Sequence, residues 1–190
     1  MKAYIGLDTS CYTASAAAVL EDGRIAADFR EALPVPDGTI GLRQSEAVFV
    51  HLRTMPALLE AVFQQIRQHE AAAVCASIKP RPVEGSYMPV FIVGKSMARS
   101  VAASLGVPYF ETTHQEGHIA AGLLGQVEMP EEFLALHVSG GTTEVLQVRQ
   151  KEAGYDISLL GGTKDISAGQ LVDRIGVLIG CRFPAGGEME

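Results

Sequence analysis

The stretch "YIGLDTSCYTASAAAVLEDGRIAADFREAL", residues 4–33, decides the fold. The apolar run Tyr4–Leu7 predicts a first strand, and "DTSC" follows it as a tight turn. Residues 13–33 then predict two more strands around a turn at Asp22–Gly23, a dipeptide that favours hairpins. Three successive strands therefore open the chain.

The elements expected after this stretch complete an alternating α/β unit. They are an amphipathic helix over Ser45–Gln68 with Ser45 as its N-cap, a strand at 71–78, a helix over Val90–Leu105 ended by Gly106, a strand at 107–111, and a helix from His114 to about Leu124. The resulting order, βββαβαβα, is that of the ribonuclease H-like unit of actin-type ATPases.

The second half of the chain repeats the opening of the first. Two strands around a glycine turn are expected over 133–150, a third over 155–162, and a helix over Ile166–Ile179. We therefore expect an α/β, actin-like ATPase fold that is duplicated, with a first ribonuclease H-like domain at 1–127 and an incomplete second one at 133–190. This suggests a fragment of a longer protein; the alternative is one domain with a βββα appendage.

Composition and charge limit the function classes. The 190 residues are 47% hydrophobic, enough for a packed core. The net charge of -7 argues against this chain alone holding nucleic acid through a broad basic surface, and it leaves open that a partner does so. Three widely spaced cysteines indicate a reducing compartment, so we expect a cytoplasmic protein. No signal peptide and no apolar run of about 18 residues is evident, so no membrane partner is expected.

The segment "THQEGHIAAG", residues 113–122, places His114 and His118 four residues apart. On a helix, this spacing projects both imidazoles from one side, which suits a divalent metal. The pair alone is weak support, because two histidines can share a helix face without a ligand. His51 and His137 are interpreted as ordinary helix and strand histidines.

Two hairpin turns are candidate phosphate loops. The first carries Asp8 and Ser10, and the second carries Ser139, Gly140 and Gly141. Their hydroxyls and backbone amides could cradle phosphates, because glycine lets the backbone approach closely. The alternative is that each is only a good turn.

The start of the last predicted helix is a candidate ribose site. Gly169 permits close approach to the helix start, whose N–H groups attract anions and hydroxyls, and Asp173 lies one turn further on. The alternative for Asp173 is a solvated carboxylate, alone or paired with Arg174.

Five motifs follow one another along the chain. They are "LDTSC" at 7–11, "HQEGH" at 114–118, "SGGTT" at 139–143, "DISAGQLVDRIG" at 165–176 and "FPAGG" at 183–187. In this order and spacing they resemble the TsaD-type tRNA threonylcarbamoyladenosine transferase family, formerly called the glycoprotease or O-sialoglycoprotein endopeptidase family. The resemblance covers nearly the whole chain.

The resemblance implies a set of roles. His114 and His118 match two metal ligands of the family, for iron, zinc or magnesium, while the third, an aspartate, lies beyond this chain. Ser139, Gly140 and Gly141 match the loop that faces the phosphates of an adenine nucleotide or threonylcarbamoyl adenylate, and Gly169 and Asp173 match the ribose site. Ser10 and Cys11 match the family's first hairpin. Members transfer the threonylcarbamoyl group to a tRNA adenosine and work with a TsaB-like paralogue. We expect such a partner, or self-association, through the first-domain helices.

Several residues depart from the family pattern and leave catalysis open. Asp8 stands where members have Glu, Tyr12 where they have Asp, Thr142 where they have His, and Gln170 where they have Glu. No catalytic residue is assigned. A noncatalytic paralogue that binds a nucleotide or partner is therefore the main alternative. A metalloprotease is disfavoured because "HQEGH" is not HExxH, and a general actin-like ATPase or sugar kinase lacks a catalytic Asp beyond Asp8.

Overall fold

The computed structural model describes residues 1–36, 42–126, 128 and 130–190. The chain forms two compact units, one of Met1–Pro34 with Arg43–Gln126 and one of Val35–Leu42 with Val127–Glu190. The assignment of the chain to two ribonuclease H-like domains at 1–127 and 133–190 stays a prediction.

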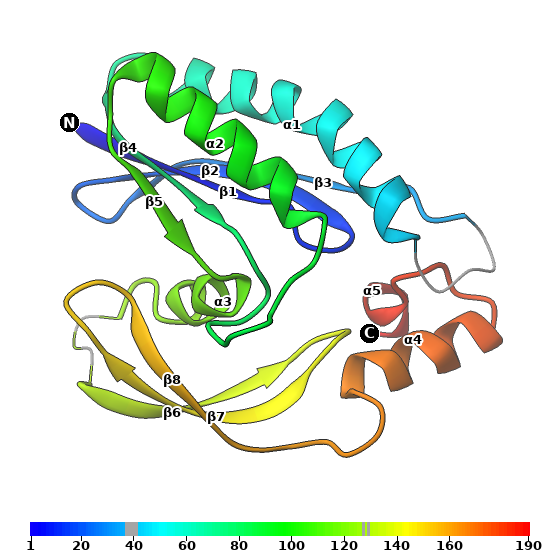
Figure 1. The fold of residues 1–190 in the computed structure, drawn as a ribbon. Coiled ribbons are helices and arrows are strands. Elements are labelled where there is room, and N and C mark those ends of the chain that lie inside the picture. The colour runs from blue at the N-terminus through cyan, green and yellow to red at the C-terminus, as the bar shows by residue number, and fades with distance from the viewer. Residues whose placement is uncertain (37–41, 127, 129) are drawn as a thin grey trace. The chain divides into compact units, whose positions relative to one another are not determined.

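The first unit is built on a five-stranded mixed sheet (Figure 1). Its strands are β1 (Lys2–Asp8), β2 (Thr13–Leu20), β3 (Ile25–Ala32), β4 (Glu70–Ser77) and β5 (Tyr109–Thr112). The spatial order is β3-β2-β1-β4-β5. β1, β2 and β3 pair antiparallel, while β4 pairs parallel with both β1 and β5. The predicted order of strands and helices in this unit is confirmed.

Two helices pack side by side on one face of this sheet (Figure 1). α1 (Gln44–Gln65) lies over β2 and β3, and α2 (Phe91–Leu105) lies over β1, β4 and β5. Alternate residues of β2 are buried, and three of the four are alanines at 14, 16 and 18. Such small side chains let a helix approach the strand closely. α2 ends at Gly106, whose positive φ of 68° fits a glycine C-cap, as predicted.

The predicted start of α1 is wrong. Arg43, in extended backbone, is the N-cap, and Ser45 already lies inside the helix. The carboxylate of Glu46 accepts the backbone N–H of Arg43 at 3.3 Å, so an acidic residue of the first turn, rather than a serine, satisfies the helix end. The helix also ends at Gln65, before the predicted Gln68.

The second unit holds a three-stranded antiparallel sheet followed by two helices. Its elements are β6 (Glu132–Val138), β7 (Thr143–Gln150), β8 (Tyr155–Gly162), α4 (Ala168–Leu178) and the short α5 (Gly186–Met189). The strands lie in the order β6-β7-β8. The predicted βββα order is confirmed, and α5 was not predicted. α5 packs where Gly176 leaves room, since a Cβ there would come within 2.9 Å of the Met189 sulfur.

Within the described ranges, no helix is both long and apolar enough to cross a membrane.

Candidate functional site

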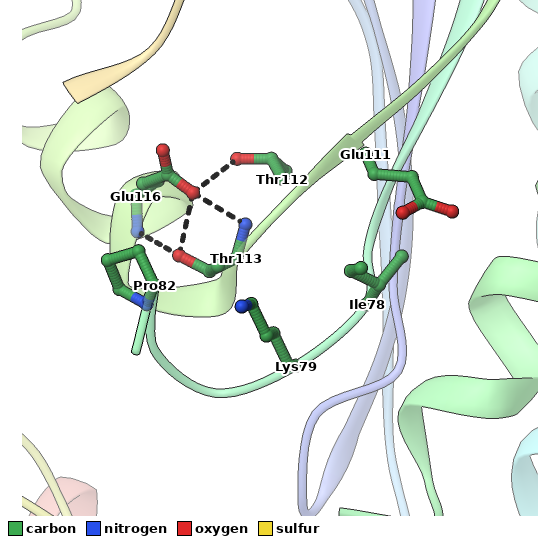
Figure 2. A pocket seen from close by; sticks show the side chains of 7 residues that line it. All are labelled: Ile78, Lys79, Pro82, Glu111, Thr112, Thr113 and Glu116. Carbon is green, nitrogen blue, oxygen red and sulfur yellow. Dashed lines mark hydrogen bonds between the residues drawn. The ribbon is translucent and has the colours of Figure 1, made fainter. Parts of the chain in front are cut away.

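α3 (His114–Gly122) directly follows β5, and the acid of "HQEGH" caps its start. The Glu116 carboxylate accepts the backbone N–H of Thr113 at 2.9 Å and the hydroxyls of Thr113 and Thr112 at 2.8 and 3.2 Å (Figure 2). In return the Thr113 hydroxyl accepts the Glu116 N–H at 3.2 Å. This reciprocal capping box holds the first turn, which carries His114.

The two histidines of the motif face each other from successive turns of α3. Their Nε2 atoms lie 2.9 Å apart, and the rings stand edge to face with centroids 4.4 Å apart. Burial, followed by the neighbouring His114, lowers the pKa of His118, which favours the neutral imidazole that binds metals. The two imidazoles therefore project from one side of α3, as the four-residue spacing predicts, and their Nε2 atoms converge on one point. Their role as metal ligands stays a prediction.

Asp8, at the end of β1, contacts this histidine pair. Its Oδ2 lies 2.9 Å from Nδ1 of His114, while its Oδ1 accepts the backbone N–H of Ser10 at 2.8 Å. Burial alone would raise the pKa of the Asp8 carboxyl, but the hydrogen bond and charge of His114, with hydrogen bonds from Ser10 and Ser77, hold it far below its usual range. The carboxylate is therefore charged at neutral pH.

The turn after β1 is held from two sides, by His51 of α1 and by Thr9 of the turn itself. Cys11 adopts a positive φ of 39°, uncommon for a non-glycine residue. The fully buried His51 of α1 places its Nε2 3.3 Å from the carbonyl oxygen of Cys11. The buried Thr9 hydroxyl donates to the carbonyl of Val90 at 2.8 Å and accepts the Gly94 N–H of α2 at 3.1 Å. The turn is thus fixed beside the histidines.

A small hollow of about 210 Å³ lies behind the start of α3 (Figure 2). Its lining residues come from the ends of β4 and β5 and from the loop and helix that follow: Ile78, Lys79, Pro82, Glu111, Thr112, Thr113 and Glu116. The Glu116 oxygen that caps the helix already accepts three hydrogen bonds, so on this side the hollow is lined by a residue with a structural role.

The described residues contain no complete metal site. No group of three or more His, Cys, Asp or Glu side chains within them is placed to hold a metal ion. The histidine pair nevertheless fits a divalent cation, because two imidazole nitrogens point at the same place and a carboxylate backs one of them. The two histidines could thus supply two of the ligands that such a cation needs, and the other ligands would have to come from elsewhere.

In the second unit, the Ser139 side chain organises the glycine loop. Its Oγ accepts the backbone N–H groups of Gly141 and Thr142 at 3.2 and 3.1 Å and lies 2.7 Å from the Thr142 hydroxyl. Thr142 Oγ1 in turn lies 3.4 Å from Nδ1 of His137. His137, interpreted as an ordinary strand residue, therefore supports the loop. No signal in the sequence distinguished it.

The start of α4 is clamped onto this loop. The Gly169 N–H donates to the Ser139 carbonyl at 3.2 Å, and the Ser167 hydroxyl donates to the Gly140 carbonyl at 2.8 Å. A Cβ on Gly169 would lie 2.6 Å from the Gly140 Cα, closer than any side chain can approach. The predicted loop and helix residues are thus brought together, and Gly169 is needed for their packing.

Asp173 already has a structural partner. Its Oδ1 accepts the backbone N–H of Ala185 at 2.9 Å, which ties α4 to the segment before α5. The sequence offered two alternatives for the Asp173 carboxylate, exposure to solvent or an ion pair with Arg174, and the hydrogen bond to Ala185 is neither of them. Its Oδ2 lies on the side of the loop, 3.9 Å from where a Cβ on Gly140 would stand.

A family model decides which proteins this chain resembles. The model described as "TsaD: tRNA N6-adenosine threonylcarbamoyltransferase" matches residues 41–190. The chain belongs to the TsaD family. The match includes both histidines, the glycine loop and the α4 start, so these features lie within the TsaD part of the chain.

Individual TsaD relatives extend the match to nearly the whole chain. A tRNA N6-adenosine threonylcarbamoyltransferase of Thermotoga neapolitana is 30% identical over 184 residues, which is 96% of this chain and 54% of that protein. Its counterpart in Syntrophobacter fumaroxidans is 33% identical over 192 residues, covering 98% and 53%. The chain therefore spans about half the length of the curated relatives it matches.

Among solved structures, YeaZ from Pseudomonas aeruginosa aligns with a TM-score of 0.53 at 13% identity, covering 89% of this chain and 68% of that one. An identity this low shows the fold alone. The fold is the α/β, actin-like class expected from the element order, and membership of the TsaD family agrees with the resemblance found in the motifs.

Proposed function

We propose that this protein acts in tRNA threonylcarbamoyladenosine modification and transfers a threonylcarbamoyl group from its adenylate to a tRNA adenosine. The observation that carries the proposal is the convergence of the His114 and His118 Nε2 atoms, 2.9 Å apart, in a member of the TsaD family. This chain spans about half the length of its curated relatives. The proposed activity is therefore that of a whole protein and not of these residues alone.

His114 and His118 would hold a divalent metal through Nε2. Such an ion supplies Lewis-acid polarisation and a template for the mixed anhydride of the adenylate. Imidazole nitrogen suits zinc or iron better than magnesium, which prefers oxygen ligands. The capping box of Thr113 and Glu116 supports this role, because it fixes the turn from which His114 projects.

The glycine loop and the start of α4 would hold the nucleotide. Within the described part of the chain, the Gly140 N–H makes no hydrogen bond, so it can donate to a phosphate oxygen. The positive end of the α4 dipole favours the same anion. Asp173, already bound to Ala185 through Oδ1, would accept from a ribose hydroxyl only through Oδ2.

The partner would be a TsaB-like paralogue or a second copy of this chain. α1 and α2 expose large apolar side chains, with Phe49, Leu52 and Ile92 between 47% and 64% exposed. Exposed apolar groups of this size on neighbouring helices are typical of interaction surfaces. tRNA would be bound within that complex, because the net charge of this chain is -7.

A second candidate is a noncatalytic subunit that binds a nucleotide or a partner. It is favoured by Tyr12 and Thr142, which stand where members of the family carry an acid and a histidine. Thr142 is engaged with Ser139 and with His137, so it serves the loop rather than facing a substrate as an acid or base.

Complementation separates the two candidates. The protein would be expressed as its full natural chain in a bacterial strain depleted of its own transferase, with the His114→Ala, His118→Ala variant as control. The proposal expects threonylcarbamoyladenosine to return to tRNA hydrolysates with the wild type but not with the control. A well-expressed wild type that restores none of the nucleoside would favour the noncatalytic subunit.

A further inference from the structure

We infer that Asp8 is a positioning residue that fixes the tautomer and orientation of His114, so that His114 and His118 present their Nε2 atoms to one divalent cation. This inference rests on the metal site proposed above. It gives Asp8 a different role from the phosphate contact expected from the sequence.

The geometry of the Asp8 carboxylate leaves it little freedom. β1 ends at Asp8, and the Ser10 N–H holds Oδ1 at 2.8 Å. The other oxygen, Oδ2, is thereby turned to Nδ1 of His114, at 2.9 Å. The side chains of Asp8 and His114 are 23% and 34% exposed, so this contact is partly shielded from water. The turn itself is anchored by Thr9 and His51, so Asp8 is held on a rigid support.

The contact determines which nitrogen of His114 carries the proton. A carboxylate can only accept a hydrogen bond, so Nδ1 of His114 must be the donor. In the neutral ring, Nε2 then carries the lone pair, and this is the atom that lies 2.9 Å from Nε2 of His118. With both rings neutral, the Nε2–H of His118 would donate to Nε2 of His114. With a cation bound, both Nε2 lone pairs would face the metal, and His118 would carry its proton on Nδ1 instead.

The chemistry of the surroundings favours this role over a phosphate contact. A carboxylate behind a ligating imidazole orients the ring and increases its basicity, which strengthens the bond to a metal. The same negative charge repels a phosphate. Asp8 therefore suits a cation at the histidines better than an anion at its own turn.

The test compares wild type, Asp8→Asn and Asp8→Ala in the chain as it stands. Asp8→Asn retains an oxygen that can accept from His114 but removes the charge. Asp28→Asn, which alters an exposed carboxylate paired with Arg30 on β3, is the matched control. Circular dichroism checks that each variant folds.

Two readouts are measured. The first is the histidine tautomer in metal-free protein, from long-range proton–nitrogen NMR spectra assigned with the His118→Ala variant. We expect Nδ1–H on His114 in wild type and in Asp28→Asn, and loss of that preference in Asp8→Ala. The second is the affinity for Co²⁺, followed by its visible absorption. We expect the dissociation constant for Co²⁺ to rise about 10–100-fold in Asp8→Ala. The value for Asp8→Asn should lie between those of wild type and Asp8→Ala.

The outcomes are distinguishable. An unchanged tautomer or an unchanged Co²⁺ affinity in folded Asp8→Ala would overturn the inference. Wild type that binds no Co²⁺ yet shows the Asp8-dependent Nδ1–H signal would contradict the proposed metal site itself, and with it the purpose assigned to Asp8.

Discussion

The backbone N–H of Gly169 donates a hydrogen bond of 3.2 Å to the carbonyl oxygen of Ser139, so α4 begins directly against the glycine loop. Glycine is the only residue that fits this approach, because any Cβ would lie 2.6 Å from the Cα of Gly140. The loop and the helix start therefore pack as one unit, and a substitution that separates them should lower the free energy of unfolding.

Substitution of Gly169 by alanine is therefore expected to destabilise the fold. Forcing a methyl group into a packed contact costs about 1–3 kcal/mol, and the loop must move away from α4 to relieve it. Urea denaturation measures the loss of unfolding free energy. Gly161→Ala, where a Cβ meets nothing within 4 Å, is the matched control and should change stability by less than about 0.5 kcal/mol. Equal effects of the two substitutions would contradict the close-approach account.

Glu116 is expected to act as a helix cap rather than as a general base. Glu116→Gln keeps an oxygen that can accept from the Thr113 N–H, so it should leave stability and complementation close to wild type. Glu116→Ala removes the side-chain half of the capping box but leaves the Thr113 N-cap, so it should cost about 0.5–1.5 kcal/mol of unfolding free energy, the range for a lost hydrogen bond. Thermal unfolding and the complementation assay together check this. Loss of function in a fully stable Glu116→Gln protein would favour a chemical role.

The buried His51 predicts an acid-sensitive fold. Burial lowers the pKa of His51, against the opposing influences of the Cys11 carbonyl and the Asp8 charge, so the folded protein keeps this imidazole neutral. The unfolded chain, with a histidine pKa of about 6.5, binds the proton first as the pH falls. The stability due to a neutral His51 is thus complete above about pH 6.5 and is lost progressively below it.

Urea midpoints of wild type and His51→Gln at pH 7.5 and pH 5.5 test this. His118, whose pKa is lowered in the same direction, is present in both proteins, so the difference between their pH dependences isolates His51. We expect the wild type to lose more stability on acidification than the variant. Identical losses would mean that His51 is not held neutral.

The Ser139 and Thr142 hydroxyls are expected to be energetically coupled. Ser139 Oγ already accepts two backbone N–H groups, so its own hydrogen is directed at Thr142 Oγ1, 2.7 Å away. Thr142→Val keeps the shape but removes this acceptor and should cost about 0.5–1.5 kcal/mol. In a double-mutant cycle with Ser139→Ala, we expect a coupling of about 0.5–3 kcal/mol. Strictly additive effects would show that the pair is not linked.

The sequence predicted the order of elements well because that order depends on local patterns. The turn at Asp22–Gly23 and the C-cap at Gly106 both have the positive glycine φ that such signals imply. The start of α1 was misplaced because an acidic residue, Glu46, completes the helix end in place of the predicted serine cap.

The site was harder to read because its contacts join distant parts of the chain. The four-residue spacing of His114 and His118 was enough to predict that their rings meet. Asp8 lies 106 residues before His114, and no local pattern indicates that the two touch. The same holds for His51 and the Cys11 carbonyl, which are brought together only when α1 packs on the sheet.

Equilibrium dialysis of this chain against Zn²⁺, with metal content measured in wild type and in the His114→Ala, His118→Ala double variant, tests the proposed metal site most directly. Two imidazoles leave most of the coordination sphere open, so we predict weak binding of one Zn²⁺ per wild-type chain, with a dissociation constant above about 1 μM. We predict that the double variant loses this binding. Zn²⁺ binding of equal affinity and stoichiometry in the folded double variant would contradict the proposed site.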